Sequence, residues 1–305
     1  MHRYLRAIGF SEIKKKSQLQ SLLQKVIQTV GLTEKKGFLE GASGRDFVSD
    51  EDDNVYAEYF LDLCEDAGIC VRGEIDENGK FEYEYYFPYM RGNHISSQED
   101  VSIERHAEKE SYAGVCDDLK VGISIIFYLQ NMVPYKRLQA MNRLPISGTT
   151  LVLGGLSVNG MIMMPIIKNE RDKRRVQKAS QDRNQLIAQA RMGDEEAIES
   201  LTLEDMDTYT VISRKIQKED VFSLVDTYFM PYGVECDQYS VLGEILEVSI
   251  EKNVLTKEEV VIMTLECNEL TLSVCINKKD LFGEPAVGRR FKGVIWLQGY
   301  INFPE

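Results

Sequence analysis

Aromatic residues and glutamates alternate from Phe81 to Tyr85. A period of two is typical of a strand that has one face in the core. The apolar segment 69–75 precedes it, and Asn78-Gly79 between the two is a strong hairpin signal. Similar short segments predict further strands of one largely antiparallel sheet at residues 55–64, 101–106, 112–116 and 121–129.

Three other patterns frame this sheet. Residues 3–10 predict a short strand, and a helix with apolar residues at helical spacing from Leu19 to Val30 follows, with Ser11 available to cap it and Gly31 to end it. Residues 149–153 and 160–167 predict a hairpin that turns through residues 157–160. Residues 1–168 are therefore expected to form a mainly antiparallel β domain with one helix.

The pattern changes at Lys168. Residues 169–192 carry only a thin apolar stripe and a basic first half, which indicates an exposed helix with solvated charges rather than a phosphate-binding patch. Gly193 ends it, and Asp194 caps a second, short helix. Strand patterns return from about residue 208. The fold class is thus α+β, with three expected units: a β-rich domain at 1–168, a helical connector at 169–207 and a small β-barrel at 208–305.

Composition and charge narrow the function classes. The chain of 305 residues has a net charge of −13, which counts against binding to nucleic acid or to an anionic membrane face. It has no apolar run long enough for a secretory signal or a membrane span. The six cysteines include no CxxC pair, so we expect reduced thiols in a cytoplasmic protein and no structural zinc.

Four blocks of sequence resemble an uncharacterised domain-of-unknown-function family, whose members have about this length and come from anaerobic Gram-positive bacteria. The blocks are residues 1–11, 192–209, 226–243 and 275–303. This resemblance implies no activity, substrate or cofactor. Separately, the glycine-containing strand segments 239–245 and 288–301 resemble those of an OB-fold, a small Greek-key barrel. A fold does not by itself imply a function.

One cluster of residues suggests acid–base or metal chemistry. His94 lies in a turn, Glu104 and His106 share one face of a strand, and Asp117 follows shortly after. Imidazole and carboxylate groups are the usual proton carriers and metal ligands. The two histidines fit no established ligand spacing, so ordinary surface residues explain them better, and no metal or cofactor is expected. An enzyme with its site here remains the first alternative function.

A second set of candidates lies in the C-terminal barrel. Arg289, Arg290, Lys292 and Tyr300 offer charge and an aromatic ring to a ligand, and single-stranded nucleic acid is the second alternative. Many glutamates surround them, and alternating aromatic residues in strands usually pack in the core. The chain also lacks the phosphate-loop, dinucleotide, zinc-protease and nucleophile-elbow motifs. We therefore expect a non-catalytic binding or scaffolding protein with a protein or small-molecule partner.

Overall fold

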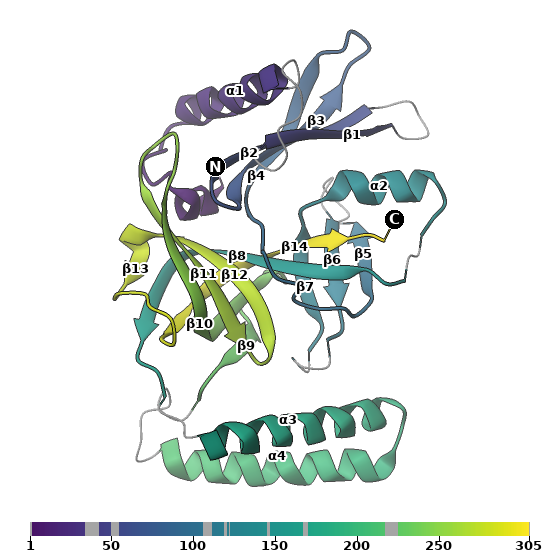
Figure 1. The fold of residues 1–305 in the computed structure, drawn as a ribbon. Helices are drawn as coiled ribbons and strands as arrows, with labels where there is room; N and C mark the ends of the chain where they lie inside the picture. The colour runs from purple at the N-terminus through teal and green to yellow at the C-terminus, as the bar shows by residue number, and fades with distance from the viewer. Residues whose placement is uncertain are drawn as a thin grey trace.

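The computed structural model describes residues 2–33, 43–49, 55–105, 112–118, 121, 123–144, 147–166, 170–216 and 225–304. It confirms the α+β class, with a four-stranded antiparallel sheet and a closed five-stranded barrel (Figure 1). None of the described helices combines the length and the apolar character that a membrane crossing requires.

The smaller sheet is built from consecutive strands. β1 (Ser43–Ser49), β2 (Val55–Cys64), β3 (Ala67–Ile75) and β4 (Phe81–Met90) pair antiparallel in chain order. The expected turn at Asn78-Gly79 joins β3 to β4, and Gly79 takes a positive φ of 76°. Helix α1 (Lys16–Thr33) packs against this sheet and buries a stripe of leucines and valines with it. Figure 1 shows α1 lying across the sheet.

The barrel has five long strands. β10 (Gln238–Lys252), β11 (Glu259–Cys267) and β12 (Leu270–Asn277) form an antiparallel meander. β8 (Thr150–Met163) pairs parallel with β12, and β14 (Arg290–Asn302) closes the barrel between β8 and β10. The order of strands around the barrel is that of an OB-fold, with one difference. β8, which pairs with the last strand of the meander, precedes the meander in the chain instead of following it.

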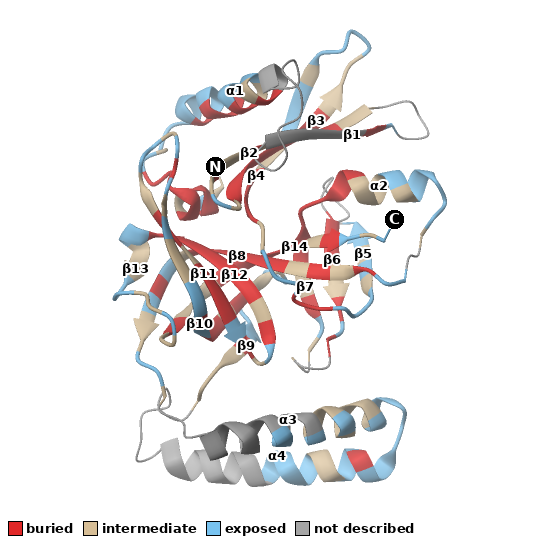
Figure 2. Ribbon diagram, in the orientation of Figure 1, coloured by how far each residue is buried: buried red, intermediate tan, exposed pale blue. Residues whose placement is uncertain are grey.

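Shorter elements extend the barrel. β5 (Val101–Arg105), β6 (Tyr112–Cys116) and β7 (Ile125–Leu129) continue the sheet beyond β14, and α2 (Met132–Ala140) follows β7. β9 (Tyr228–Pro231) pairs with β10, and β13 (Leu281–Phe282) pairs with β8 after the 3₁₀ turn η3 (Lys278–Asp280). Buried residues concentrate inside the barrel and between it and the smaller sheet (Figure 2).

The N-terminal segment differs from the expected strand. Arg3–Ile8 forms a 3₁₀ helix, η1, which Gly9 ends with a φ of 92°. Tyr4, Leu5, Ala7 and Ile8 are buried, and η1 packs between β4 and the barrel strands β8 and β12. Trp296 on β14 is buried, but its ring lies 5.4 Å from the ring of Tyr4 and packs with the residues between the two β layers rather than in the barrel core.

The expected hairpin at 149–167 is also wrong, since β8 is one continuous strand. The glycines that suggested a turn serve close packing instead. A Cβ on Gly160 would lie 2.4 Å from the Phe291 ring, and one on Gly154 would lie 1.9 Å from the Met90 carbonyl oxygen. The barrel thus takes a strand from residues assigned to the N-terminal unit, and the division into separate units at 168 and 207 remains a prediction.

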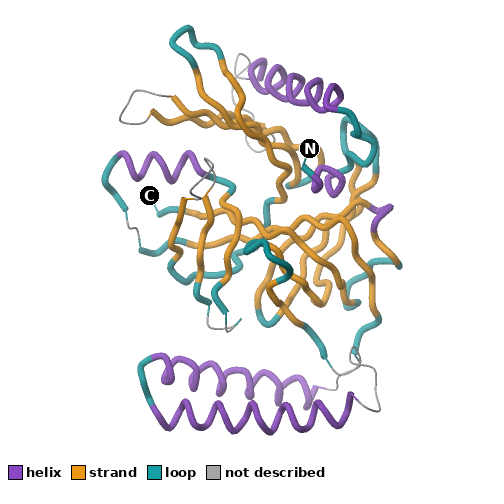
Figure 3. The backbone as a smooth tube through the Cα atoms, turned by 180° about the vertical axis from the view of Figure 1, so that it is seen from behind, coloured by secondary structure: helices purple, strands orange, loops and turns teal. Residues whose placement is uncertain are grey.

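Two long helices follow β8. α3 (Glu170–Arg191) coincides with the expected exposed helix, and α4 (Glu195–Ile216) is much longer than the short helix expected there. Gly193 has a φ of 88°, and the Asp194 side chain accepts a hydrogen bond from the Ala197 N–H, as a helix cap does. The two helices pack on each other and form a hairpin apart from the β layers when viewed from either side (Figures 1 and 3).

Candidate functional site

A pocket of about 270 Å³ lies where the smaller sheet meets α2 and the end of β14. Its lining residues come from four separate parts of the chain: β2, the residue after β4, the start of α2 and β14. They are Glu58, Phe60, Arg91, Asn131, Pro134 and Tyr300. The pocket therefore exists only when the smaller sheet and the barrel are assembled together.

The base of the pocket is a buried ion pair. Arg72 on β3 lies directly opposite Glu58 on β2, and its Nε is 2.5 Å from Glu58 Oε1. Arg72 also donates to the Tyr128 hydroxyl and to the carbonyl oxygens of Leu129 and Gln130. These bonds reach across from the smaller sheet to β7. The pair fixes how the two layers meet, because a buried charge is tolerated only when it is paired and hydrogen-bonded.

Arg91 is the accessible charge in the pocket. Its guanidinium lies over the rings of Phe60 and Tyr89, with the central carbon 5.2 and 4.7 Å from the ring centroids. Its Nη1 is 3.6 Å from Asp62 Oδ1, which is an ion pair but too long for a hydrogen bond. The Arg91 side chain keeps 30% of its surface exposed. The two rings thus hold the guanidinium in place, and most of its N–H groups can donate to a further acceptor.

The neighbouring carboxylate is committed elsewhere. Asp62 accepts a hydrogen bond from the Tyr89 hydroxyl. Burial raises the pKa of that hydroxyl well above its usual value. Burial also raises the pKa of the Asp62 carboxyl, and the Arg91 charge and the Tyr89 hydrogen bond oppose that rise. Asp62 therefore neutralises part of the Arg91 charge without saturating it.

The opposite wall is rigid. Asn131 is buried, and its side-chain amide both donates to and accepts from the main chain of Ile301. These two hydrogen bonds tie the start of α2 to β14 and thereby fix Pro134 and Tyr300 at the rim of the pocket. A ligand would thus meet the Arg91 guanidinium, the Tyr300 ring and the apolar surfaces of Phe60 and Pro134.

The four barrel residues that the sequence suggested as ligand-binding candidates do not lie together. Tyr300 lines the pocket, whereas Arg290 is buried and donates to the carbonyl oxygens of Met164, Val225 and Asp226. Arg290 thereby holds together the two places where the chain leaves and re-enters the β layers around the helical hairpin. Arg289 donates to the Glu284 carbonyl, and Lys292 is half-buried on β14. None of these three lines the pocket.

The structure describes three of the four acid–base candidates. His94 is exposed, and its Nδ1 lies 2.7 Å from the Asn93 side chain. Glu104 is exposed on β5, and Asp117 accepts a hydrogen bond from Ser124. His106 lies outside the described residues. Among the described residues, no three histidine, cysteine or acidic side chains lie close enough together to hold a metal ion.

Two other hollows are less suited to a ligand. One of about 430 Å³ is lined by residues 256–259, Lys278 and Lys279, and its charges pair with each other at 2.8 and 3.5 Å. The other, of about 160 Å³ beside Glu65, Asp66 and Glu247, has acidic walls in a protein that is already strongly acidic. The pocket at Arg91 alone among these three combines a half-exposed cation with aromatic walls.

Sequence reasoning missed most of this pocket. Glu58 and Arg72 carried a usable signal, since each is a charged residue with uncharged neighbours on both sides in a largely apolar strand segment. Arg91 and Asn131 carried none, because each follows a strand and resembles an ordinary loop residue until the sheet and the barrel are packed together.

Comparison with known proteins gives one match. A family model described as "Domain of unknown function, E. rectale Gene description (DUF3881)" covers residues 5–299. No curated protein and no solved structure matches the chain. Because the model spans nearly the whole chain, including both β layers and the helical hairpin, the protein belongs to the DUF3881 family, a family of unknown function.

Proposed function

We propose that this protein is a non-catalytic binding protein whose pocket at Arg91 takes a small monocarboxylate with a flat apolar body. The observation that supports this best is the Arg91 guanidinium, which is held over two rings, half-exposed in the pocket and engaged by one long ion pair. Such a group binds a carboxylate with two parallel hydrogen bonds. Phe60 and Pro134 supply the apolar surface for the rest of the ligand.

The surrounding charge favours one negative charge on the ligand rather than two. The Asp62 carboxylate already neutralises part of the Arg91 charge, and the whole chain carries a net charge of −13. A dianion such as a phosphate monoester would be repelled by both. The volume of about 270 Å³ suits a ligand of metabolite size. The proposal places this role in the cytoplasm, in keeping with six free cysteines.

The barrel surface counts against the nucleic-acid alternative. The outer face of β10 and β11 carries Glu244 and Glu266 as direct cross-strand neighbours, both exposed. Arg290 is committed to carbonyl oxygens, and Trp296 is covered by η1. Base stacking and phosphate contacts would need these groups to be available.

Ligand-observed NMR with benzoate and phenylacetate as probes tests the proposal, with benzamide and phenylacetamide as neutral counterparts. We expect the carboxylates to bind and the amides to bind at least about ten-fold more weakly, a difference of about 1.4 kcal/mol. Arg91→Gln should lower carboxylate binding by a similar factor, and Arg91→Lys should restore part of it. Arg289→Gln is the matched control and should leave binding unchanged.

Circular dichroism and thermal melting of each variant establish that the fold is intact. Equal binding of acids and amides, or unchanged binding by folded Arg91→Gln, would overturn the proposal. Loss of binding in Arg289→Gln would move the site to the barrel surface instead.

A further inference from the structure

The part of the helical hairpin α3–α4 whose side chains the structure describes, between residues 178 and 206, buries little apolar surface. Among its described side chains, Ala197 alone is buried. Ile198, Leu203 and Met206 keep 47, 57 and 63% of their surface exposed on α4. Each helix has 22 residues and is about 33 Å long. Helices gain most of their stability by packing an apolar face. A pair of helices with exposed apolar side chains can therefore bury more apolar surface by binding a partner.

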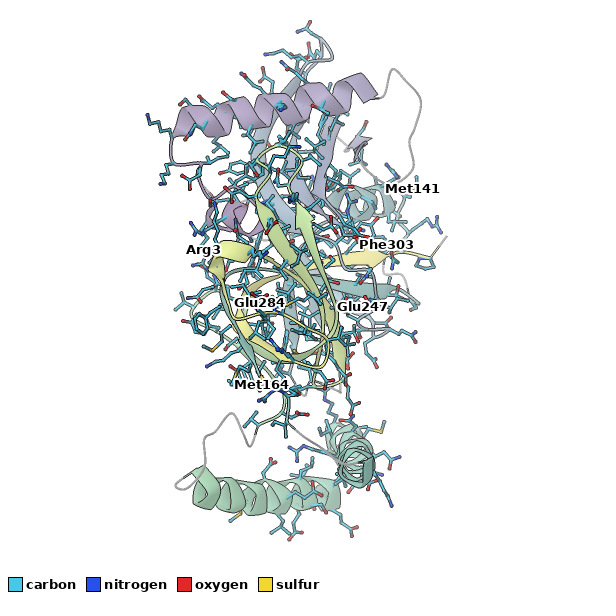
Figure 4. All side chains as sticks on the ribbon, turned by 60° about the vertical axis from the view of Figure 1, so that its left-hand side comes forward. Arg3, Met141, Met164, Glu247, Glu284 and Phe303 are labelled. Atoms are coloured by element: carbon cyan, nitrogen blue, oxygen red, sulfur yellow. The ribbon has the colours of Figure 1, made fainter. Side chains whose placement is uncertain are left out.

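The hairpin projects from the body as an insertion. Arg290 bonds to Met164 on one side and to Val225 and Asp226 on the other, so the chain leaves and returns at one place. In Figure 4 Met164 lies at the edge of the body that faces the hairpin, and the hairpin side chains extend into the open. This geometry presents a long two-helix surface without disturbing the barrel.

Charge is divided between the two ends of the hairpin. The end nearest the body, residues 170–180 and 206–216, has seven basic and three acidic residues. The far end, residues 181–205, has two basic and seven acidic residues. Within one hairpin, Arg183 already pairs with Asp205 at 2.8 Å and lies 3.6 Å from Glu204. The remaining acids at the far end, such as Glu195, Glu196 and Glu199, are exposed.

We propose that the hairpin is a self-association arm that binds the hairpin of a second copy of this chain in antiparallel orientation. A twofold axis then sets the basic near end of each copy against the acidic far end of the other. It also covers Ile198, Leu203 and Met206. A parallel arrangement would bring like charges together along the whole length. Two faces of this length bury on the order of 1,000 Å², which a specific dimer requires.

Charge-swap variants test the arrangement in the full-length protein. The far-end variant is Glu195→Lys with Glu196→Lys and Glu199→Lys. The near-end variant is Arg174→Glu with Arg175→Glu and Lys178→Glu. We expect the wild type to have twice the monomer mass by light scattering and sedimentation, and each variant alone to be a monomer. An equimolar mixture of the two variants should form a heterodimer, because both of its contacts pair opposite charges again.

An apolar variant gives an independent measurement. Leu203→Ser with Met206→Ser changes exposed side chains and should leave the monomer folded, as Trp296 emission will report. It should weaken the dimer at least ten-fold. A monomeric wild type at tens of micromolar, a dimer that survives every variant, or a variant mixture that stays monomeric would each overturn the proposal.

Discussion

Single buried polar residues decide how the two β layers meet. Gln298 on β14 donates to the Pro88 carbonyl and accepts from the Met90 N–H, and Gln130 donates to Gln298 and to the Met90 carbonyl. All the groups are buried, so each lost bond leaves a donor or acceptor without water. Sequence patterns identify apolar faces, but they cannot identify which glutamine finds a carbonyl in another layer.

The Arg72–Glu58 pair gives a residue-level prediction. Arg72→Met leaves the Glu58 carboxylate in the core without its guanidinium, and we expect it to lower the free energy of unfolding by about 3–5 kcal/mol. Arg72→Met with Glu58→Leu should recover part of that loss, because no isolated buried charge remains. Urea unfolding measures both. Lys80→Met, which breaks the exposed pair with Glu82, is the control and should change stability by less than about 1 kcal/mol.

His2 gives a second prediction at this scale. Its imidazole lies 4.6 Å from the Trp296 ring, and burial, with help from the N-terminal and Arg3 charges, lowers its pKa from 6.5 to about 4. The unfolded chain therefore binds a proton between pH 6.5 and 4 that the folded chain does not. The His2 contribution is constant above pH 6.5 and destabilises the fold progressively as the pH falls toward 4, by about 2–3 kcal/mol.

His2→Phe keeps a ring against Trp296 but cannot titrate. Subtracting its pH–stability curve from that of the wild type cancels the carboxylates that titrate in the same range. The difference should fall between pH 6.5 and 4 and be level above 6.5. A difference that is flat across the whole range would show that His2 is not buried as described.

At the scale of elements, sequence periodicity predicted strands and helices where one physical signal dominated. The hairpin at Asn78-Gly79 is such a case, since alternation on both sides agrees with the turn. β8 is the opposite case, because the residues that resemble a turn are small for packing reasons visible only when Phe291 and Met90 are in place. η1 was missed since six residues with several buried side chains fit a strand equally well.

The contact between η1 and β14 gives the element-scale prediction. Tyr4 is 4% exposed and its ring stacks on Trp296, whose indole N–H donates to Asp237 at 2.6 Å. Tyr4→Ala should cost about 3–5 kcal/mol of stability and shift the Trp296 emission to longer wavelength as water enters. Tyr83→Ala removes a ring that is 44% exposed, and this control should leave the emission unchanged. Emission of the wild type at the wavelength of free indole would contradict the burial of Trp296.

At the scale of the molecule, the class could be predicted, but the assembly of the barrel could not. Nothing in residues 150–163 indicates that they pair with β12 and β14, more than a hundred residues later. Such long-range pairing has no local signature, and the helical hairpin between them obscures it further. The pocket at Arg91 depends on the same assembly, which is why its residues were scattered among loops and strands in the sequence.

Limited trypsin digestion distinguishes two separate folding units from a barrel that is shared between the two parts of the chain. Lys178 and Arg191 are exposed on the hairpin, so we expect the first cuts between Lys168 and Arg191, and faster cutting as ionic strength rises and weakens ion pairs along the hairpin. If 1–168 and 208–305 are separate folding units, the two fragments should separate on a native column. Because β8 lies in the first fragment and pairs with β12 and β14 in the second, we expect them instead to elute together and to separate only in denaturant. Native separation into two folded fragments would support independent units. First cuts inside residues 239–303 would contradict the barrel itself.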